Sequence, residues 1–209
     1  MHSYPINLNM NGRTVMVVGL GAVGQRKAKA LCEAGAHVVG IDPLVKSFDD
    51  DALSSMHVIS ERYQIEHLRG IDLVIAAASV VVNQQIVADA RKKKIWVCSA
   101  TDPDEGDFTI PAVWTSGPLV LTVSTSGASP ALACILRDQA AAALGPAAVG
   151  LSEIFAELRP LVLRRFTNPL ARKHIFEAWA NPEWLSLWTE HGPQVVRQML
   201  ERLIDKELS

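Results

Sequence analysis

Cysteine and histidine, the residues that build disulfide frameworks and many metal sites, are scarce or scattered in this chain. Its 209 residues include three cysteines, an odd number with no Cys-x-x-Cys spacing: Cys32, Cys98 and Cys134. Cysteines of this kind, set among apolar neighbours, are typical of buried free thiols in a reducing compartment. The six histidines show no metal-ligand spacing, so the sequence predicts no metal site.

Long apolar runs and an excess of charge of one sign are also missing. No apolar run approaches the roughly 20 residues that cross a bilayer, and residues 1–5 lack the features of a signal peptide. The formal net charge of −2 gives no overall attraction to nucleic acid or to an anionic membrane. We therefore expect a cytoplasmic protein with no nucleic-acid or membrane partner.

What the sequence does contain is a continuous dinucleotide-binding pattern from Arg13 to Asp42. The apolar, β-branched run at 14–18 predicts a strand that is buried on both faces. It leads directly into Gly19-Leu20-Gly21-Ala22-Val23-Gly24, a complete G-x-G-x-x-G. A helical pattern follows, and residues 37–41 supply a second strand that ends at Asp42.

Each glycine of this loop has a physical task. Gly19 permits the tight turn, Gly21 lets the backbone approach a pyrophosphate, and Gly24 lets the helix pack closely on the strand. Free N–H groups at the helix N-terminus favour bound phosphates. Asp42 follows Gly24 by 18 positions, close to the spacing of a carboxylate that binds ribose hydroxyls and repels a 2′-phosphate. The sequence therefore predicts NAD rather than NADP.

The alternation of strands and helices continues to about residue 112. Further strands are expected at 57–60, 72–78 and 95–99, and helices at 52–56 and 83–93. Small residues that end the strand at 72–78, Ala78 among them, leave room for a ligand at the edge of the sheet. The predicted fold is α/β, with a Rossmann-type doubly wound parallel sheet as an NAD-binding domain over residues 1–112.

After residue 112 the pattern changes to a strand pair and then to helices. Two strands, at 108–114 and 118–123, precede the hydroxyl-rich loop Ser124-Thr125-Ser126-Gly127-Ala128-Ser129-Pro130. Ser129 suits an N-cap and Pro130 the first position of a helix that Gly145-Pro146 breaks near residue 144. A small strand-helix region is thus expected at 113–145, followed by a helical C-terminal domain at 146–209 with breaks near Pro160, Pro169, Pro182 and Gly192-Pro193.

Several of these motifs resemble the precorrin-2 dehydrogenase family, which comprises the N-terminal module of siroheme synthases and its free-standing relatives. The resemblance covers residues 4 to 140 and is most specific in the loop from Ser124 to Pro130, after two strands and a Rossmann half. The other matching motifs are Tyr4-Pro5-Ile6-Asn7-Leu8, Gly12-Arg13-Thr14-Val15, Arg26-Lys27-Ala28, Glu33-Ala34-Gly35-Ala36, Phe108-Thr109-Ile110-Pro111-Ala112 and Gly117-Pro118-Leu119.

The resemblance implies NAD-dependent oxidation of precorrin-2 to sirohydrochlorin, in the branch that leads to siroheme and sometimes cobalamin. It implies a homodimer held by the region at 113–145. It also implies that the residues matching Ala22, Val23, Pro43 and Leu44 bind the cofactor, and that Thr125 lies in a loop facing the tetrapyrrole.

Two departures from the family pattern bear on the chemistry. Many members carry an aspartate, thought essential for catalysis, at the position that aligns with Thr101, whereas here the acid is the next residue, Asp102. The stretch Ser79-Val80-Val81-Val82-Asn83 stands where relatives usually show a polar, acidic stretch that is one residue longer. We expect little or no metal insertion.

The sequence also offers candidate residues for proton transfer and for substrate binding in such a reaction. Asp102 is the first candidate for a general base and Asp104 the second, although both equally suit a polar turn. A substrate with eight carboxylates needs donors, for which the candidates are Ser124, Thr125, Ser126 and Arg137. Three alternatives stay open: an NAD-binding regulatory module without turnover, an oxidoreductase for another substrate, and a tetrapyrrole-binding paralogue.

Overall fold

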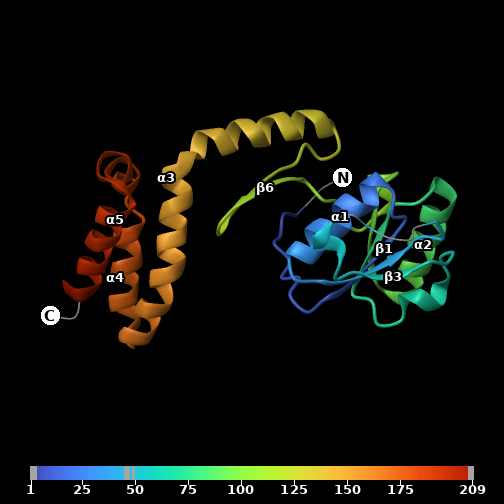
Figure 1. The fold of residues 1–209 in the computed structure, drawn as a ribbon, viewed down its shortest axis with the longest axis horizontal. Coiled ribbons are helices and arrows are strands. Elements are labelled where there is room, and N and C mark those ends of the chain that lie inside the picture. The colour runs from blue at the N-terminus through green and yellow to red at the C-terminus, as the bar shows by residue number, and fades with distance from the viewer. Residues whose placement is uncertain (1–3, 45–47, 49, 207–209) are drawn as a thin grey trace. The chain divides into compact units, whose positions relative to one another are not determined.

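The computed structural model describes residues 4–44, 48 and 50–206 and divides the chain into two compact units, Met1–Ile110 and Pro111–Ser209 (Figure 1). Each unit has its own apolar core. The division into three domains expected from the sequence stays a prediction.

The first unit is built on a five-stranded sheet in which every neighbouring pair is parallel. Its strands are β1 (Thr14–Val18), β2 (His37–Ile41), β3 (His57–Ile59), β4 (Leu73–Ala76) and β5 (Trp96–Ser99). The strand order β3-β2-β1-β4-β5 means that the chain extends to one side of β1 and then crosses to the other. Ligands of such sheets bind where the order reverses, at the carboxyl ends of β1 and β4. The predicted doubly wound α/β fold is confirmed.

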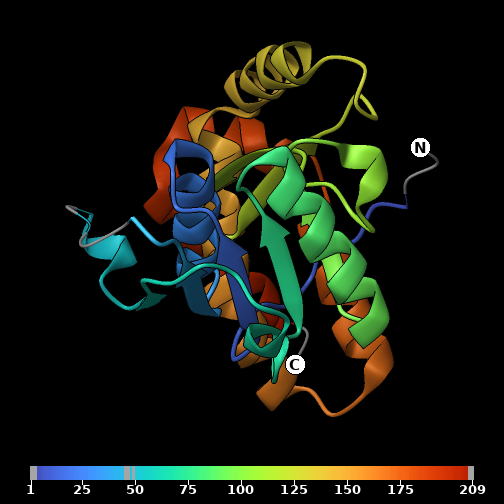
Figure 2. The same cartoon turned by 90° about the vertical axis from the view of Figure 1, so that its right-hand side faces the viewer.

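Alternating side chains of β1 supply both cores of this unit. Val15 and Val17 pack with α1 (Ala22–Glu33), whereas Met16 and Val18 pack with α2 (Val80–Lys93). Figure 2 shows these two helices, blue and green, on opposite sides of the sheet. Because successive residues of a strand point to opposite faces, a strand covered on both sides must be apolar throughout.

Several element boundaries differ from those expected. The helix expected from residue 83 begins at Val80, and β4 ends at Ala76 instead of residue 78. Valine has low intrinsic helix propensity, but the buried face formed by Asn83, Ile86 and Ala90 sets the helix in place and overrides it. Short 3-10 helices occur at η1 (Asp51–Leu53), η2 (Ile65–Leu68) and η3 (Pro103–Glu105), and only η1 falls where a helix was expected.

The second unit starts with an antiparallel hairpin of β6 (Ala112–Ser116) and β7 (Leu119–Val123). The first strand was expected from residue 108, which is wrong: it begins only after Pro111, which has no N–H to donate to a ladder. The expected Ser129 N-cap is confirmed, because Ser129 Oγ accepts the Leu132 N–H at 3.2 Å with Pro130 in the first turn of the next helix.

The remainder consists of α3 (Pro130–Arg165), α4 (Pro169–Trp179) and α5 (Glu183–Lys206). Gly145 has non-helical angles, φ 67° and ψ 175°, and kinks α3 at the expected break. Gly192 kinks α5 in the same way. The expected break near Pro160 is wrong, because Leu158 and Val162 on either side of it are buried in the core shared with α4 and α5 and hold the helix through that point.

By length and composition alone, α3 is also apolar enough to cross a membrane. Its kink at Gly145 separates two parts with different surroundings. Leu151, Ile154 and Leu158 in the second part pack against α4 and α5, as in the core helix of a globular unit. In the first part, Ile135 and Leu136 are exposed.

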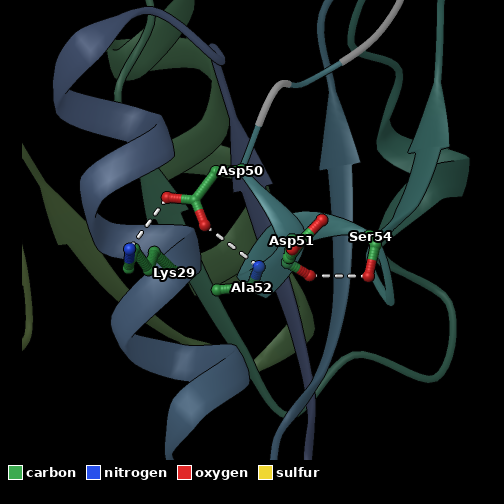
Figure 3. Close-up of polar contacts among 5 residues, drawn as sticks. All are labelled: Lys29, Asp50, Asp51, Ala52 and Ser54. Atoms are coloured by element: carbon green, nitrogen blue, oxygen red, sulfur yellow. Dashed lines mark hydrogen bonds and ion pairs between the residues drawn. The ribbon is translucent and has the colours of Figure 1, made fainter.

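An ion pair joins α1 to the connection between β2 and β3 (Figure 3). Asp50 Oδ2 accepts a hydrogen bond from Lys29 Nζ at 2.8 Å, and its Oδ1 accepts the Ala52 N–H at 3.0 Å. The Ser54 hydroxyl donates to the Asp51 carbonyl at 2.6 Å. The hydrogen bond from Lys29 lowers the pKa of Asp50, and the same bond raises the pKa of Lys29.

The stability that this pair contributes should depend on pH. Asp50→Asn keeps an acceptor for the Ala52 N–H but removes the charge, so the variant should be less stable than the parent near pH 7. Because the pKa of Asp50 is lowered in the folded state, its contribution is complete above the unfolded value of about 3.9 and is lost as pH falls through the folded value. Urea unfolding at about pH 7 and in progressively more acid buffers measures this difference.

Asp51→Asn, which removes the same charge beside the pair, serves as the control and should show a smaller difference near pH 7. A stability difference for Asp50→Asn that stayed constant on acidification would contradict the assignment.

Candidate functional site

The glycine loop between β1 and α1 is packed too closely for side chains at two positions. Gly19 has a φ of +88°, and a Cβ there would lie 2.5 Å from the Ala77 carbonyl oxygen. A Cβ on Gly24 would lie 1.8 Å from the Gly19 carbonyl oxygen. Gly19 also donates its N–H to the Ile41 carbonyl at 2.8 Å. The loop therefore touches the ends of both β2 and β4.

Gly21 lies in different surroundings. A Cβ there would meet no heavy atom within 4 Å, and its backbone is extended, with φ −69°. Gly21 is the N-cap of α1, where it supplies no side-chain bond, and the first turn contains no acidic residue. The exposed Ala22 and Val23 follow it. An uncapped helix N-terminus with open space in front of it fits the phosphates of a dinucleotide.

Asp42 lies at the end of β2 and connects the two loops beside it. Its Oδ2 accepts the Leu20 N–H at 2.8 Å, and its Oδ1 accepts the Leu44 N–H at 2.9 Å. Pro43 and Leu44 are exposed, and Leu44 retains 86% of its accessible surface although it is apolar. The carboxylate is thus held beside the glycine loop, where the ribose of a dinucleotide would lie. Residues 45–47 and 49 lie outside the described part of the chain.

The end of β4 is held by a residue that the sequence analysis did not single out. Asn83, in the first turn of α2, is fully buried. Its Oδ1 accepts the Ala78 N–H at 2.9 Å, and its Nδ2 donates to the Ala78 carbonyl at 3.3 Å and to Thr101 Oγ1 at 3.1 Å. The signal available in the sequence was an asparagine on the same helical face as Ile86, Val87 and Ala90, because a polar group on a buried face needs partners.

The loop after β5 carries both candidate bases. Asp102 is the N-cap of η3, and its Oδ1 accepts the Asp104 N–H at 3.0 Å. Asp102 also donates its own N–H to Ser99 Oγ at 3.2 Å. Both aspartates are exposed. The structure therefore contains the local turn that the sequence allowed, and the same turn leaves the second oxygen of Asp102 available to a ligand.

Cys98 lies next to this loop but is a poor nucleophile. Its side chain is buried within β5, and burial raises the pKa of the thiol, which keeps it protonated at neutral pH. The described residues contain no group of three or more His, Cys, Asp or Glu side chains placed to hold a metal ion.

The hydroxyl-rich loop belongs to the second unit, and much of its hydrogen bonding is internal. The Thr125 hydroxyl donates to the Ser129 carbonyl and accepts the Ser129 N–H, both at 3.0 Å. Ser124 Oγ accepts the N–H of Ser126, whose φ of 52° lies in the left-handed region. Because the one hydrogen of the Thr125 hydroxyl is already donated, Thr125 can only accept from a ligand, and the hydroxyls of Ser124 and Ser126 are the better donors.

Arg137, the remaining candidate for substrate binding, is already paired. Its Nε and Nη2 nitrogens contact Asp138 Oδ1 at 2.8 and 2.7 Å, and Nη1 lies 3.4 Å from the Val113 carbonyl oxygen on the hairpin. Arg137 thus links α3 to β6. Binding a carboxylate would require it to exchange at least one of these partners.

The fold and the glycine loop define a Rossmann-type dinucleotide-binding protein. A family model described as "Putative NAD(P)-binding" matches residues 6–112, which is 107 of the 209 residues. The chain belongs to this NAD(P)-binding family. The match covers the glycine loop, Asp42 and the whole parallel sheet.

Siroheme synthases are among the curated relatives, which confirms the resemblance noted in the sequence. The chain is 35% identical over 182 residues to the siroheme synthase of Nitrosomonas eutropha, covering 85% of this chain and 38% of that protein. It is 33% identical over 194 residues to that of Neisseria meningitidis serogroup B, covering 90% and 39%. The chain thus spans less than half the length of these relatives.

A solved structure described as "SirC, precorrin-2 dehydrogenase" shares the fold. It superposes with a TM-score of 0.74 at 22% sequence identity and covers 96% of this chain and 100% of that chain. The arrangement of a parallel sheet followed by a hairpin and helices is therefore common to both.

Dinucleotide binding should depend on the open space at Gly21. Gly21→Asp would place a carboxylate where a pyrophosphate approaches, while its extended backbone and lack of close neighbours should preserve the fold. We expect the dissociation constant for NAD(H) to rise by roughly tenfold or more, measured by calorimetry.

Ala88→Asp, which adds the same charge on the exposed face of α2, is the matched control and should bind like the parent. Equal affinities of Gly21→Asp and the parent, with both folded by circular dichroism, would mean that the dinucleotide binds elsewhere.

Proposed function

We propose that this protein catalyses the NAD-dependent dehydrogenation of precorrin-2 to sirohydrochlorin in siroheme biosynthesis. The observation that carries the proposal is the dinucleotide cradle formed by the uncapped N-terminus of α1, the open Gly21 and the Asp42 carboxylate. The similarity to siroheme synthases over most of the chain supports the substrate class.

The residues of the cradle bind and orient the cofactor. The first-turn amides of α1 bind its phosphates, and Asp42 accepts hydrogen bonds from its ribose. NAD, when bound, supplies a hydride acceptor at its nicotinamide ring. Asp42 would also oppose the 2′-phosphate of NADP, and this repulsion favours NAD.

Proton transfer and substrate binding fall to other residues. The free carboxylate oxygen of Asp102 can accept the proton that leaves the tetrapyrrole, since Oδ1 is already bonded to the Asp104 amide. In the second unit, the hydroxyls of Ser124 and Ser126 and the guanidinium of Arg137 are the candidate donors for substrate carboxylates, with Thr125 holding the loop in shape.

We also propose that the protein is a homodimer. The hairpin and the first part of α3 leave large apolar side chains exposed: Val113, Val120, Leu132, Ile135, Leu136 and Leu144, at 39–56%. Apolar surface of this kind is typical of an interface. A second copy that covers it would account for the exposure, and a cytoplasmic location fits a chain whose cysteines are free thiols.

A tetrapyrrole-binding paralogue without turnover is the second candidate function. It is favoured by one observation: the residue at the position of the family aspartate is Thr101, whose hydroxyl is bonded to Asn83. The two candidates are separated by adding NAD and enzymatically generated precorrin-2 to the purified protein and following NADH absorbance. Gly21→Asp should abolish the signal. A tetrapyrrole that binds without NADH formation would support the paralogue.

Cofactor choice should follow Asp42. Because a 2′-phosphate would face a fixed carboxylate, NAD should bind at least roughly tenfold tighter than NADP. Calorimetric titration of both measures the ratio. Asp42→Asn, which removes the charge at nearly constant volume, should bring the two affinities closer. Equal affinities in the parent would remove Asp42 from the ribose site.

Loss of the Asp102 charge should slow turnover. Asp102→Asn keeps an oxygen for the Asp104 N–H but cannot take a proton, so kcat should fall by roughly 10²–10⁴-fold, with NAD affinity unchanged. Steady-state kinetics measure kcat, with Asp51→Asn, at an exposed carboxylate of η1, as the control and Asp104→Asn as the test of the second candidate base. A near-normal kcat in Asp102→Asn would mean that this residue only shapes the turn.

A charge on the exposed part of α3 should dissociate the dimer. Leu136→Glu would bury a carboxylate against apolar surface, so the protein should elute as a monomer in size-exclusion chromatography with light scattering. Leu170→Glu, at an exposed leucine of α4, should leave the mass unchanged. A parent that is itself monomeric, or a dimeric Leu136→Glu, would argue against this interface.

A further inference from the structure

Asn83 bonds two neighbouring loops of the first unit, beside two other links: the Ala100 N–H donates to the Ala76 carbonyl at 2.8 Å, and Arg91 donates to the Glu105 carbonyl at 2.8 Å. From the first turn of α2, its buried side chain bonds both backbone groups of Ala78, after β4, and the Thr101 hydroxyl, after β5. A single side chain thus spans the carboxyl ends of two neighbouring strands. Because Asn83 is completely buried, its own amide has to find its partners within the protein, whereas Thr101 is exposed at the surface.

The bonds continue beyond Thr101 to the candidate base. Thr101 Oγ1 lies 3.2 Å from Ser99 Oγ, and Ser99 Oγ accepts the N–H of Asp102 at 3.2 Å. Thr101 accepts from Asn83, which leaves its hydroxyl hydrogen free to bond Ser99. A continuous series of hydrogen bonds therefore runs from Ala78 to the backbone of Asp102.

We propose that Asn83 is a positioning residue that, through Thr101, fixes the loop carrying Asp102 relative to the cofactor end of β4. The Thr101 hydroxyl has a structural partner on the inner side of the loop, which assigns it to the bridge instead of to proton transfer. This inference rests on the proposed dehydrogenase function for its effect on rate, although the bridge itself can be tested without turnover.

Thr101 offers the cleaner test, because Asn83→Ala would leave the groups of Ala78 buried without partners and could unfold the unit. Thr101→Val removes the acceptor for Asn83 and the bond to Ser99 at almost constant shape, and it leaves both bonds between Asn83 and Ala78 in place. Thr101→Ser restores the hydroxyl. Thr189→Val, which removes a threonine hydroxyl bonded to a backbone carbonyl of α5 in the other unit, is the matched control.

The first measurement is hydrogen exchange of residues 99–106 in the absence of substrate. Loss of the bridge should increase exchange at the Asp102 amide by roughly tenfold in Thr101→Val, with Thr101→Ser and Thr189→Val close to the parent. Unchanged exchange in Thr101→Val would overturn the proposal, since the loop would then be held without Asn83.

The second measurement is steady-state kinetics over a range of pH. Thr101→Val should lower kcat by roughly ten- to a hundredfold through misplacement of Asp102, with the dissociation constant for NAD within about twofold of the parent. The pH at which activity falls should match the parent, whereas Asp102→Asn should lose that dependence. Thr101→Ser should recover the rate.

A normal kcat in Thr101→Val despite faster exchange would overturn the positioning role. A parent without turnover would contradict the proposed function instead, and the exchange comparison would then decide alone whether Asn83 holds the loop.

Discussion

The contact between the turn after β1 and the first turn of α1 is the constraint on which the first unit depends. A Cβ on Gly24 would fall 1.8 Å from the Gly19 carbonyl oxygen, so the helix can approach only without a side chain there. That approach places α1 over Val15 and Val17 of β1. Since α1 begins at the same point, the contact that packs the unit also presents the uncapped helix N-terminus at the carboxyl edge of the sheet.

Polar side chains at that edge accept hydrogen bonds from backbone N–H groups. Asp42 accepts main-chain N–H groups after β1 and β2, Asn83 accepts one after β4, and Asp102 accepts one after β5. A buried backbone group without a partner costs about 1–3 kcal/mol, so the part-buried bonds from Leu20 and Ala78 define where the Asp42 and Asn83 side chains point. The lone pairs that remain are held in a fixed direction before any ligand arrives, which is the condition for selective binding and for efficient proton transfer.

The parts of this architecture that could be predicted from the sequence are those specified locally. The apolar run of β1, the glycine loop and Asp42 lie within 29 residues of the sequence, from Thr14 to Asp42, so their order and spacing alone indicate the fold. The start of α2 at Val80 could not be read in this way, because β-branched residues disfavour a helix that tertiary packing imposes. Asn83 was missed for a related reason: Thr101, 18 residues along the chain, becomes its neighbour only when β4 and β5 pair.

The hydroxyl-rich loop shows a different limit on what the sequence alone can predict. Its resemblance to a family motif identified the segment, and Ser129 as N-cap followed from local rules. Which hydroxyl is free to donate depends on hydrogen bonds inside the loop, and there Thr125 is committed to Ser129 at both its donor and an acceptor position. A threonine so bound can be required for the shape of a site without giving a hydrogen bond to the ligand. The neighbouring Ser124 and Ser126, which are exposed, keep hydroxyl hydrogens that a ligand can accept.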